Sequence, residues 1–151
     1  VAQTRLAWTA AEVARRRPDL RETFVPYALH GVRFLRDTMW DREHGGFHWC
    51  LDADGALSNA HGDEKHAYGV AFGIYAEANV HRATQDPDAL ALATEAFAWL
   101  DRHAHDAVNG GYAESLRRPR TASSRRRNRS TTAPATRSGW CGVAAPTSSA
   151  S

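Results

Sequence analysis

The chain has 151 residues, 42% of them hydrophobic, and a formal net charge of +2 at pH 7. This length is typical of one domain, and the sequence contains neither the long apolar run of a membrane-spanning helix nor the pattern of a secretory signal. We therefore expect a cytoplasmic protein, whose small net charge averages an acidic segment (residues 1–116, 11 basic and 17 acidic side chains) and a basic one (residues 117–151, 8 arginines and no acidic residue).

Two helices are predicted at the start of the chain. The first should end at Pro18, which lacks a backbone donor and restricts the residue before it. Its stripe at helical spacing consists of Leu6, Thr9, Ala10, Val13 and Arg17. Because Pro26 fits best in a first turn, we expect the second helix to begin near Thr23 as its N-cap. The stripe of this second helix consists of Phe24, Ala28, Val32, Leu35 and Met39.

Two further helices are predicted after a loop that is rich in Gly, Asp, Asn and His, residues 45–62. Alternating apolar side chains in that loop allow a short hairpin: Phe47, Trp49 and Leu51. The stripe of the third helix consists of Ala67, Val70, Ala71, Ile74, Tyr75 and Ala78. The fourth helix has the clearest start signal, with Asp86 as its N-cap and Pro87 in its first position. Its stripe consists of Ala89, Leu92, Ala93, Ala96, Phe97 and Leu100.

An internal repeat relates the two pairs of helices. The pattern D-x-x-x-G-G-aromatic occurs at residues 41–47 and again, 65 residues later, at residues 106–112. Each unit is a helical hairpin followed by this loop, and such hairpins bury their apolar faces by stacking on one another. Because Asp41 and Asp106 occupy equivalent positions, we interpret them as turn residues and not as a catalytic pair of carboxylates.

Residues 117–151 differ in kind, since they contain no Leu, Ile, Phe, Tyr or Met. Such a segment cannot bury enough apolar surface to offset its ordering entropy, so a disordered tail is expected. Three origins are weighed: a frameshifted continuation of the gene, which we favour, an ordinary flexible tail, and a basic tail that binds nucleic acid. A single aromatic residue, Trp140, is present for base stacking, so we expect no nucleic-acid partner.

Four segments, taken in order, resemble the N-acylglucosamine 2-epimerase family, which includes cellobiose 2-epimerases and mannose or sulfoquinovose isomerases. They are residues 3–9 (QTRLAWT), 40–47 (WDREHGGF), 65–76 (KHAYGVAFGIYA) and 103–114 (HAHDAVNGGYAE). The resemblance implies an all-α fold, a partial (α/α)6 barrel to which residues 1–116 contribute about four of twelve helices. It also implies that the chain begins inside the second helix of the barrel.

The family's reaction removes a proton next to the sugar carbonyl and returns it to the other face of that carbon or to its neighbour. The resemblance assigns Arg5 to catalysis as the barrel-lining arginine, and makes Tyr68, Trp8 and Lys65 candidate contacts of a small sugar substrate. Core packing is the alternative for Tyr68 and Trp8, and a structural salt bridge is the alternative for Lys65. The family's catalytic histidines belong to later helices, so this chain is expected to be inactive alone.

No cofactor or metal is expected. Four histidines gather near the Gly-rich loop, but their spacing matches no metal-binding pair: His44, His48, His61 and His66. The favoured interpretation is a fragment of a carbohydrate 2-epimerase or aldose–ketose isomerase. The alternative is a non-catalytic helical-repeat fragment with a binding or structural role.

Overall fold

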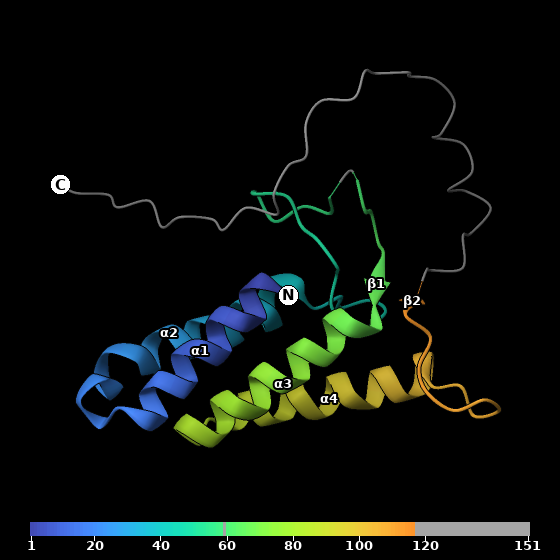
Figure 1. The fold of residues 1–151 in the computed structure, drawn as a ribbon. Helices are drawn as coiled ribbons and strands as arrows, with labels where there is room; N and C mark the ends of the chain where they lie inside the picture. Colours follow the sequence, from blue (N-terminus) through green and yellow to red (C-terminus); the bar gives the residue numbers. More distant parts are fainter. Residues whose placement is uncertain (59, 117–151) are drawn as a thin grey trace.

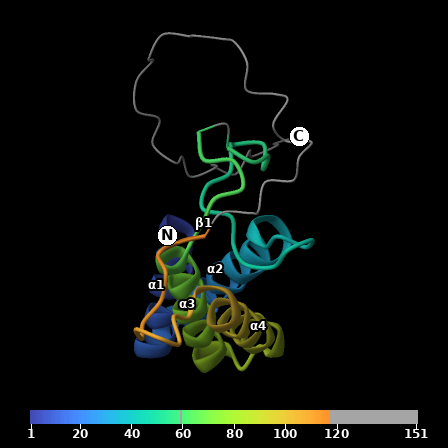
Figure 2. The ribbon, with the colours of Figure 1, turned by 90° about the vertical axis from the view of Figure 1, so that its right-hand side faces the viewer.

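The computed structural model describes residues 1–58 and 60–116, and these residues form four α-helices in two layers. Helices α1 (Ala2–Arg16) and α3 (Ala67–Thr84) lie side by side in one layer, and α2 (Arg21–Phe34) and α4 (Pro87–Ala104) form the other (Figure 2). The predicted all-α fold is therefore confirmed. The tail predicted for residues 117–151 lies outside the described residues.

The long connections gather at one end of the layers, where α1 and α3 begin (Figure 1). Two short strands meet there, β1 (Lys65–His66) and β2 (Ser115–Leu116), and they pair antiparallel. The expected hairpin after α2 is reduced to isolated bridges, Trp40 to Phe47 and Leu51 to Leu57. None of the described helices is long and apolar enough to cross a membrane.

Helix α1 buries small side chains, and of the predicted stripe only Ala10 is buried. Its buried face consists of Thr4, Ala7, Ala10, Ala11 and Ala14, whereas Leu6 is 53% exposed. The reason is the close approach of the neighbouring helix α2: a Cβ added to Gly31 would lie 2.4 Å from the Cβ of Ala7. Larger side chains do not fit this contact, so they point away from it.

Helix α2 begins two residues before the predicted cap. A 3-10 turn at Pro18–Leu20 leads directly into Arg21, so the prediction of Thr23 as N-cap is wrong. Pro26 consequently lies inside the helix and leaves one carbonyl without its usual donor. The predicted stripe is otherwise confirmed, because Ala28, Val32 and Leu35 are buried. The helix ends in a π-helical turn, Leu35–Met39.

Helices α3 and α4 form the second hairpin. Gln85 ends α3 in the left-handed conformation (φ 61°), and the Asp86 side chain accepts a hydrogen bond of 2.9 Å from the Ala89 N–H, as the predicted cap requires. The predicted stripe of α4 is buried except for Phe97, which is 54% exposed. On α3, Ala71 and Tyr75 of the predicted stripe are exposed rather than buried. Phe97 and Tyr75 are large rings on helices whose buried faces are mostly small.

A carboxylic acid lies within the core of α3. Glu77 is fully buried, one turn from Val80 on the buried face, and neither of its carboxylate oxygens has a hydrogen-bond partner among the described residues. Burial raises the pKa of Glu77 to about 9, because the charged form loses its hydration. The side chain is therefore protonated at neutral pH.

Replacing Glu77 by Gln is predicted to stabilise the chain above pH 5. Between the ordinary pKa of 4.5 and about 9, the folded chain holds a proton that the unfolded chain has lost, so stability falls as pH rises. The free energy of unfolding falls by up to about 1.4 kcal/mol per pH unit in this range. Glutamine does not titrate, so Glu77→Gln removes this dependence on pH. Urea unfolding followed by circular dichroism at pH 5, 7 and 8.5 measures this slope. Glu95→Gln, at an exposed position of α4, is the matched control. If the free energy of unfolding depends on pH equally in the two variants, the prediction is wrong.

Candidate functional site

The two repeat loops have the same backbone hydrogen bonds. In each, the aspartate N–H donates to the carbonyl of the second glycine, at 2.9 Å in the loop 41–47 and 3.0 Å in the loop 106–112. The N–H of the first glycine donates to the aspartate carbonyl, at 2.8 Å in both. The carboxylate of each aspartate also accepts from the two N–H groups that lie two and three residues later. The sequence repeat is therefore a structural repeat, and both aspartates build turns.

Both loops need glycine where the chain reverses. The four glycines have φ between 68° and 86°, a region that residues with a Cβ rarely adopt. The first loop is also covered: a Cβ on Gly45 or Gly46 would lie within 2.8 Å of Trp99, whose indole N–H donates to the His44 carbonyl at 2.8 Å. At Gly110 and Gly111 an added Cβ would meet no atom within 4 Å.

A buried ion pair fixes the first loop to the start of the second hairpin. Lys65 Nζ lies 2.7 Å from Asp41 Oδ2, and both side chains are about 5% exposed. Burial alone would raise the pKa of Asp41, but the hydrogen bonds from Lys65 and from the N–H groups of His44 and Glu43 outweigh it and hold the pKa well below its ordinary value. Lys65 Nζ also lies over the Trp99 ring, 5.4 Å from its centroid.

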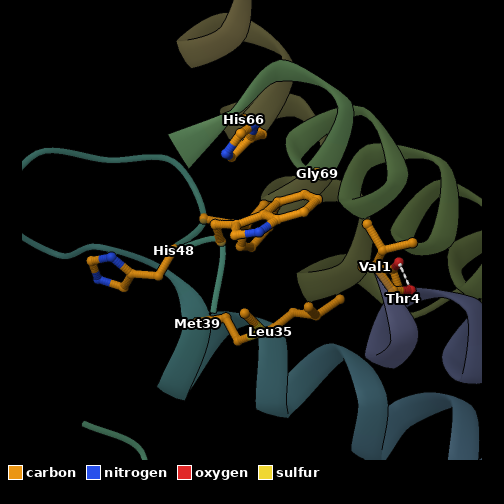
Figure 3. A pocket seen from close by; sticks show the side chains of 9 residues that line it. Val1, Thr4, Leu35, Met39, His48, His66 and Gly69 are labelled. Carbon is orange, nitrogen blue, oxygen red and sulfur yellow. Dashed lines mark hydrogen bonds between the residues drawn. The ribbon is translucent and has the colours of Figure 1, made fainter. Parts of the chain in front are cut away.

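A small cleft lies between this loop region and the starts of α1 and α3 (Figure 3). Its walls are mainly apolar and consist of Val1, Thr4, Leu35, Met39, Phe47, His48, Trp49, His66 and Gly69. His48 points away from the other labelled side chains, and His66 packs on the Trp49 ring at 4.3 Å between centroids. None of the four side chains predicted to serve the site lines this cleft.

Arg5 and Tyr68 meet on the exposed face of the α1/α3 layer, opposite α2 and α4. Arg5 Cζ lies 5.3 Å from the centroid of the Phe72 ring, and Tyr68 meets the same ring edge-on with centroids 4.8 Å apart. Tyr68 is 48% exposed, and Arg5 is exposed. In the described part of the chain, neither the Arg5 guanidinium nor the Tyr68 hydroxyl has a hydrogen-bond partner. Their polar groups are therefore available to a ligand.

Trp8 lies on the same face, beyond Arg5 along α1. Its ring stacks on Tyr75, with centroids 5.7 Å apart and planes 21° apart. Asn79 Nδ2 donates to the Trp8 carbonyl at 3.4 Å, which is a further link between α1 and α3. We call α1 and α3 the inner helices, α2 and α4 the outer helices, and the five side chains Arg5, Trp8, Tyr68, Phe72 and Tyr75 the inner-face cluster.

The structure thus brings together three of the four predicted site residues and places Lys65 elsewhere, on Asp41. Phe72 and Tyr75 were not singled out from the sequence. Helical spacing could have identified Phe72, because it lies four residues after Tyr68 and therefore on the same side of α3. The spacing of Tyr75 also fits the apolar stripe of α3, which predicts a place in the core.

No histidine belongs to the inner-face cluster. Among the described residues, no group of three or more His, Cys, Asp or Glu side chains is arranged to hold a metal ion. Some imidazole rings contact aromatic rings of the loops and of α4: His66 contacts Trp49, and His103 contacts Trp99.

Comparison with known proteins identifies the relatives of this chain. The model of the N-acylglucosamine 2-epimerase (GlcNAc 2-epimerase) family matches residues 1–133. The cellobiose 2-epimerase of Bacteroides fragilis is 33% identical over 118 residues, which are 78% of this chain and 29% of that protein. The cellobiose 2-epimerase of Dictyoglomus turgidum is 33% identical over 96 residues, 64% of this chain and 23% of that protein.

Solved structures show the same arrangement of helices. The cellobiose 2-epimerase of Spirochaeta thermophila is 34% identical with a TM-score of 0.68, and the match covers 76% of this chain and 27% of that one. A family 76 glycoside hydrolase of Bacteroides thetaiotaomicron has a TM-score of 0.62 at 19% identity, which shows a shared fold alone. The four helices are therefore part of an (α/α)6-barrel fold. The chain spans less than a third of the length of these relatives.

Asp41→Asn is predicted to destabilise the chain much more than Asp106→Asn. The first substitution leaves the buried ammonium of Lys65 without its counter-charge, which costs about 3–5 kcal/mol. The second affects only an exposed turn, so about 1 kcal/mol is expected. Urea unfolding at pH 7 measures the free energy of unfolding of the two variants, which change equivalent positions of the two repeat loops.

The acid response provides an independent check of the same ion pair. Because its pKa is lowered in the fold, Asp41 contributes stability above its ordinary pKa of 3.8, and this stability is lost as the pH falls below that value. The wild-type chain should therefore lose more stability below pH 4 than Asp41→Asn does. Equal losses for the two aspartate variants at pH 7, or identical acid responses of wild type and Asp41→Asn, would show that the pair does not support the fold.

Proposed function

The chain belongs to the N-acylglucosamine 2-epimerase family, and on that premise we propose that its inner-face cluster is part of the sugar-binding wall of a carbohydrate 2-epimerase or aldose–ketose isomerase. The observation that carries the proposal is that Arg5 and Tyr68 both contact the Phe72 ring. Among the described residues, neither the guanidinium nor the hydroxyl has a hydrogen-bond partner. The substrate is a small sugar with a free carbonyl form.

Arg5 is proposed to stabilise the negative charge of the reaction. Removal of the proton next to the carbonyl places charge on the carbonyl oxygen of an enediolate-like intermediate. A fixed positive group near that oxygen stabilises it most where little reorganisation is needed. Guanidinium suits this role because it stays charged at every relevant pH and offers several donors in one plane.

Tyr68 and Trp8 are proposed to contact the sugar itself. The hydroxyl of Tyr68 can donate to a sugar oxygen and accept from a sugar hydroxyl, since it can do both. The half-buried indole of Trp8 offers an apolar surface to the C–H groups of a sugar ring, although its Tyr75 partner already covers part of that surface. For Lys65 we propose the structural role, because its ammonium is buried against Asp41.

The proton transfer itself needs groups that the inner-face cluster lacks. Imidazole is suited to it, since its ordinary pKa lets it act as base and as acid near neutral pH. The five side chains of the inner-face cluster include no imidazole. We therefore propose that the chain alone binds sugar without turning it over.

A non-catalytic helical-repeat role is the second candidate function. The stacking of the two hairpins and the repetition of their loops favour it, because such repeats often present a surface to a partner. The two candidates differ in one measurable property, which is whether the inner face binds a sugar.

Mannose and cellobiose are predicted to bind the chain weakly, with Arg5→Ala reducing affinity by about tenfold, the scale of a hydrogen bond to a charged group. Titration monitored by NMR chemical shifts of the α1 and α3 amides measures the affinity. Arg33→Ala, an exposed arginine of the outer helix α2, is the matched control and should change nothing.

Chromatography of the sugars after incubation with the chain tests the second half of the proposal. No 2-epimer and no ketose should form. Binding that is equal in wild type and Arg5→Ala would favour the non-catalytic role, and turnover that depends on Arg5 would show that the chain is an enzyme by itself.

A further inference from the structure

Phe72 supports both side chains that the proposed sugar site depends on. It lies in the second turn of α3, partly buried, and its ring receives the Arg5 guanidinium from α1 at 5.3 Å. The Tyr68 ring meets it at 4.8 Å with an angle of 62° between the planes, an edge-to-face contact. One ring therefore contacts a residue of each inner helix.

We propose that Phe72 is a positioning residue of the sugar site: it holds Arg5 by a cation–π contact and Tyr68 by an edge-to-face contact, so that both present their polar groups to the substrate. This inference rests on the proposed function. It adds a residue that does not touch the sugar but determines where two sugar-contacting groups lie.

The chemistry of the contact explains why a ring suits this position better than a carboxylate. A carboxylate would bind the guanidinium through its N–H fork and would neutralise its charge. A phenyl ring attracts the cation by its π electrons and carries no acceptor oxygen, so the donors of Arg5 remain free. The charge is then available to the oxygen on which negative charge develops.

Other arginines of the chain pair with carboxylates, whereas Arg5 contacts a ring. Arg15 pairs with Glu12, Arg17 with Asp19, and Arg36 with Asp37, and all three are surface ion pairs. In the described residues, Arg5 has no such acidic partner, although it is exposed. Its described side-chain contact is the Phe72 ring.

The packing of the inner helices fixes the position of this ring. Alanines of α1 share a buried cluster with Val80 and Ala83 of α3, and the Asn79 side chain links α3 to the Trp8 carbonyl. The four-residue spacing from Tyr68 to Phe72 places both rings on one face of α3. The geometry of Arg5 and Tyr68 is therefore set by the same helix pair.

The first test measures the Arg5–Phe72 contact without any sugar. In the 15N NMR spectrum of the chain, the Nε–H signal of Arg5 should carry a ring-current shift from Phe72. Phe72→Leu should remove that shift, whereas Phe72→Trp should retain one, because indole also binds cations. Tyr75→Leu, which removes another ring of the same face, is the matched control. An Arg5 signal that is the same in wild type and Phe72→Leu would overturn the proposal.

The second test asks whether the contact serves binding. Phe72→Leu should weaken mannose or cellobiose affinity about two- to fivefold, the scale of an exposed cation–π contact, and Phe72→Trp should restore it. In a chain that already carries Arg5→Ala, Phe72→Leu should reduce the sugar affinity clearly less, because only the contact of Phe72 with Tyr68 is then left to lose. An equal loss in both backgrounds would mean that Phe72 acts only by packing and would overturn the proposal.

The two tests separate this inference from the proposed function. If the wild-type chain binds no sugar, the proposed function fails, and the Arg5 signal still decides whether Phe72 positions the guanidinium. If sugar binds and the Arg5 signal does not respond to Phe72→Leu, the positioning role fails while the sugar site stands.

Discussion

The buried pair of Lys65 and Asp41 connects the two hairpins, and much of the described structure depends on it. It fixes the loop 41–47 to the residue pair that leads into α3. Trp99 of α4 then covers the glycines of that loop, and Phe47 packs where Gly73 leaves room on α3. A charge pair of this kind supplies little net stability relative to apolar packing, but either partner alone would be costly to bury. Its effect is to fix how one unit sits on the next.

Small residues determine where the large ones go. Ala7 and Gly31 bring α1 so close to α2 that a side chain as large as Leu6 does not fit between them, and Leu6 is exposed. Tyr75 stacks on Trp8 on the face of the inner layer that also carries Arg5 and Tyr68. The small side chains are thus buried behind that face, and the large rings lie on it.

Local signals were sufficient to predict the four helices but not the faces that they bury. The cap at Asp86 and the repeat of the D-x-x-x-G-G loops could be read directly, because each depends on neighbours in the sequence. The buried face of α1 could not, since leucine usually lies inside and only the partner helix excludes it here. The burial of Glu77 was likewise invisible, because a glutamate on a helix is ordinarily solvated. Family resemblance named Arg5 and Tyr68, whereas the ring that joins them required the packing of α1 on α3.

The loop 106–112 forms the same turn as the loop 41–47 although no lysine or tryptophan of the described residues covers it. Its conformation is therefore encoded by its own aspartate and glycines. A turn that its own residues hold in place loses little further chain entropy when another surface packs against it, so the entropic cost of such a contact is lower than for a flexible loop.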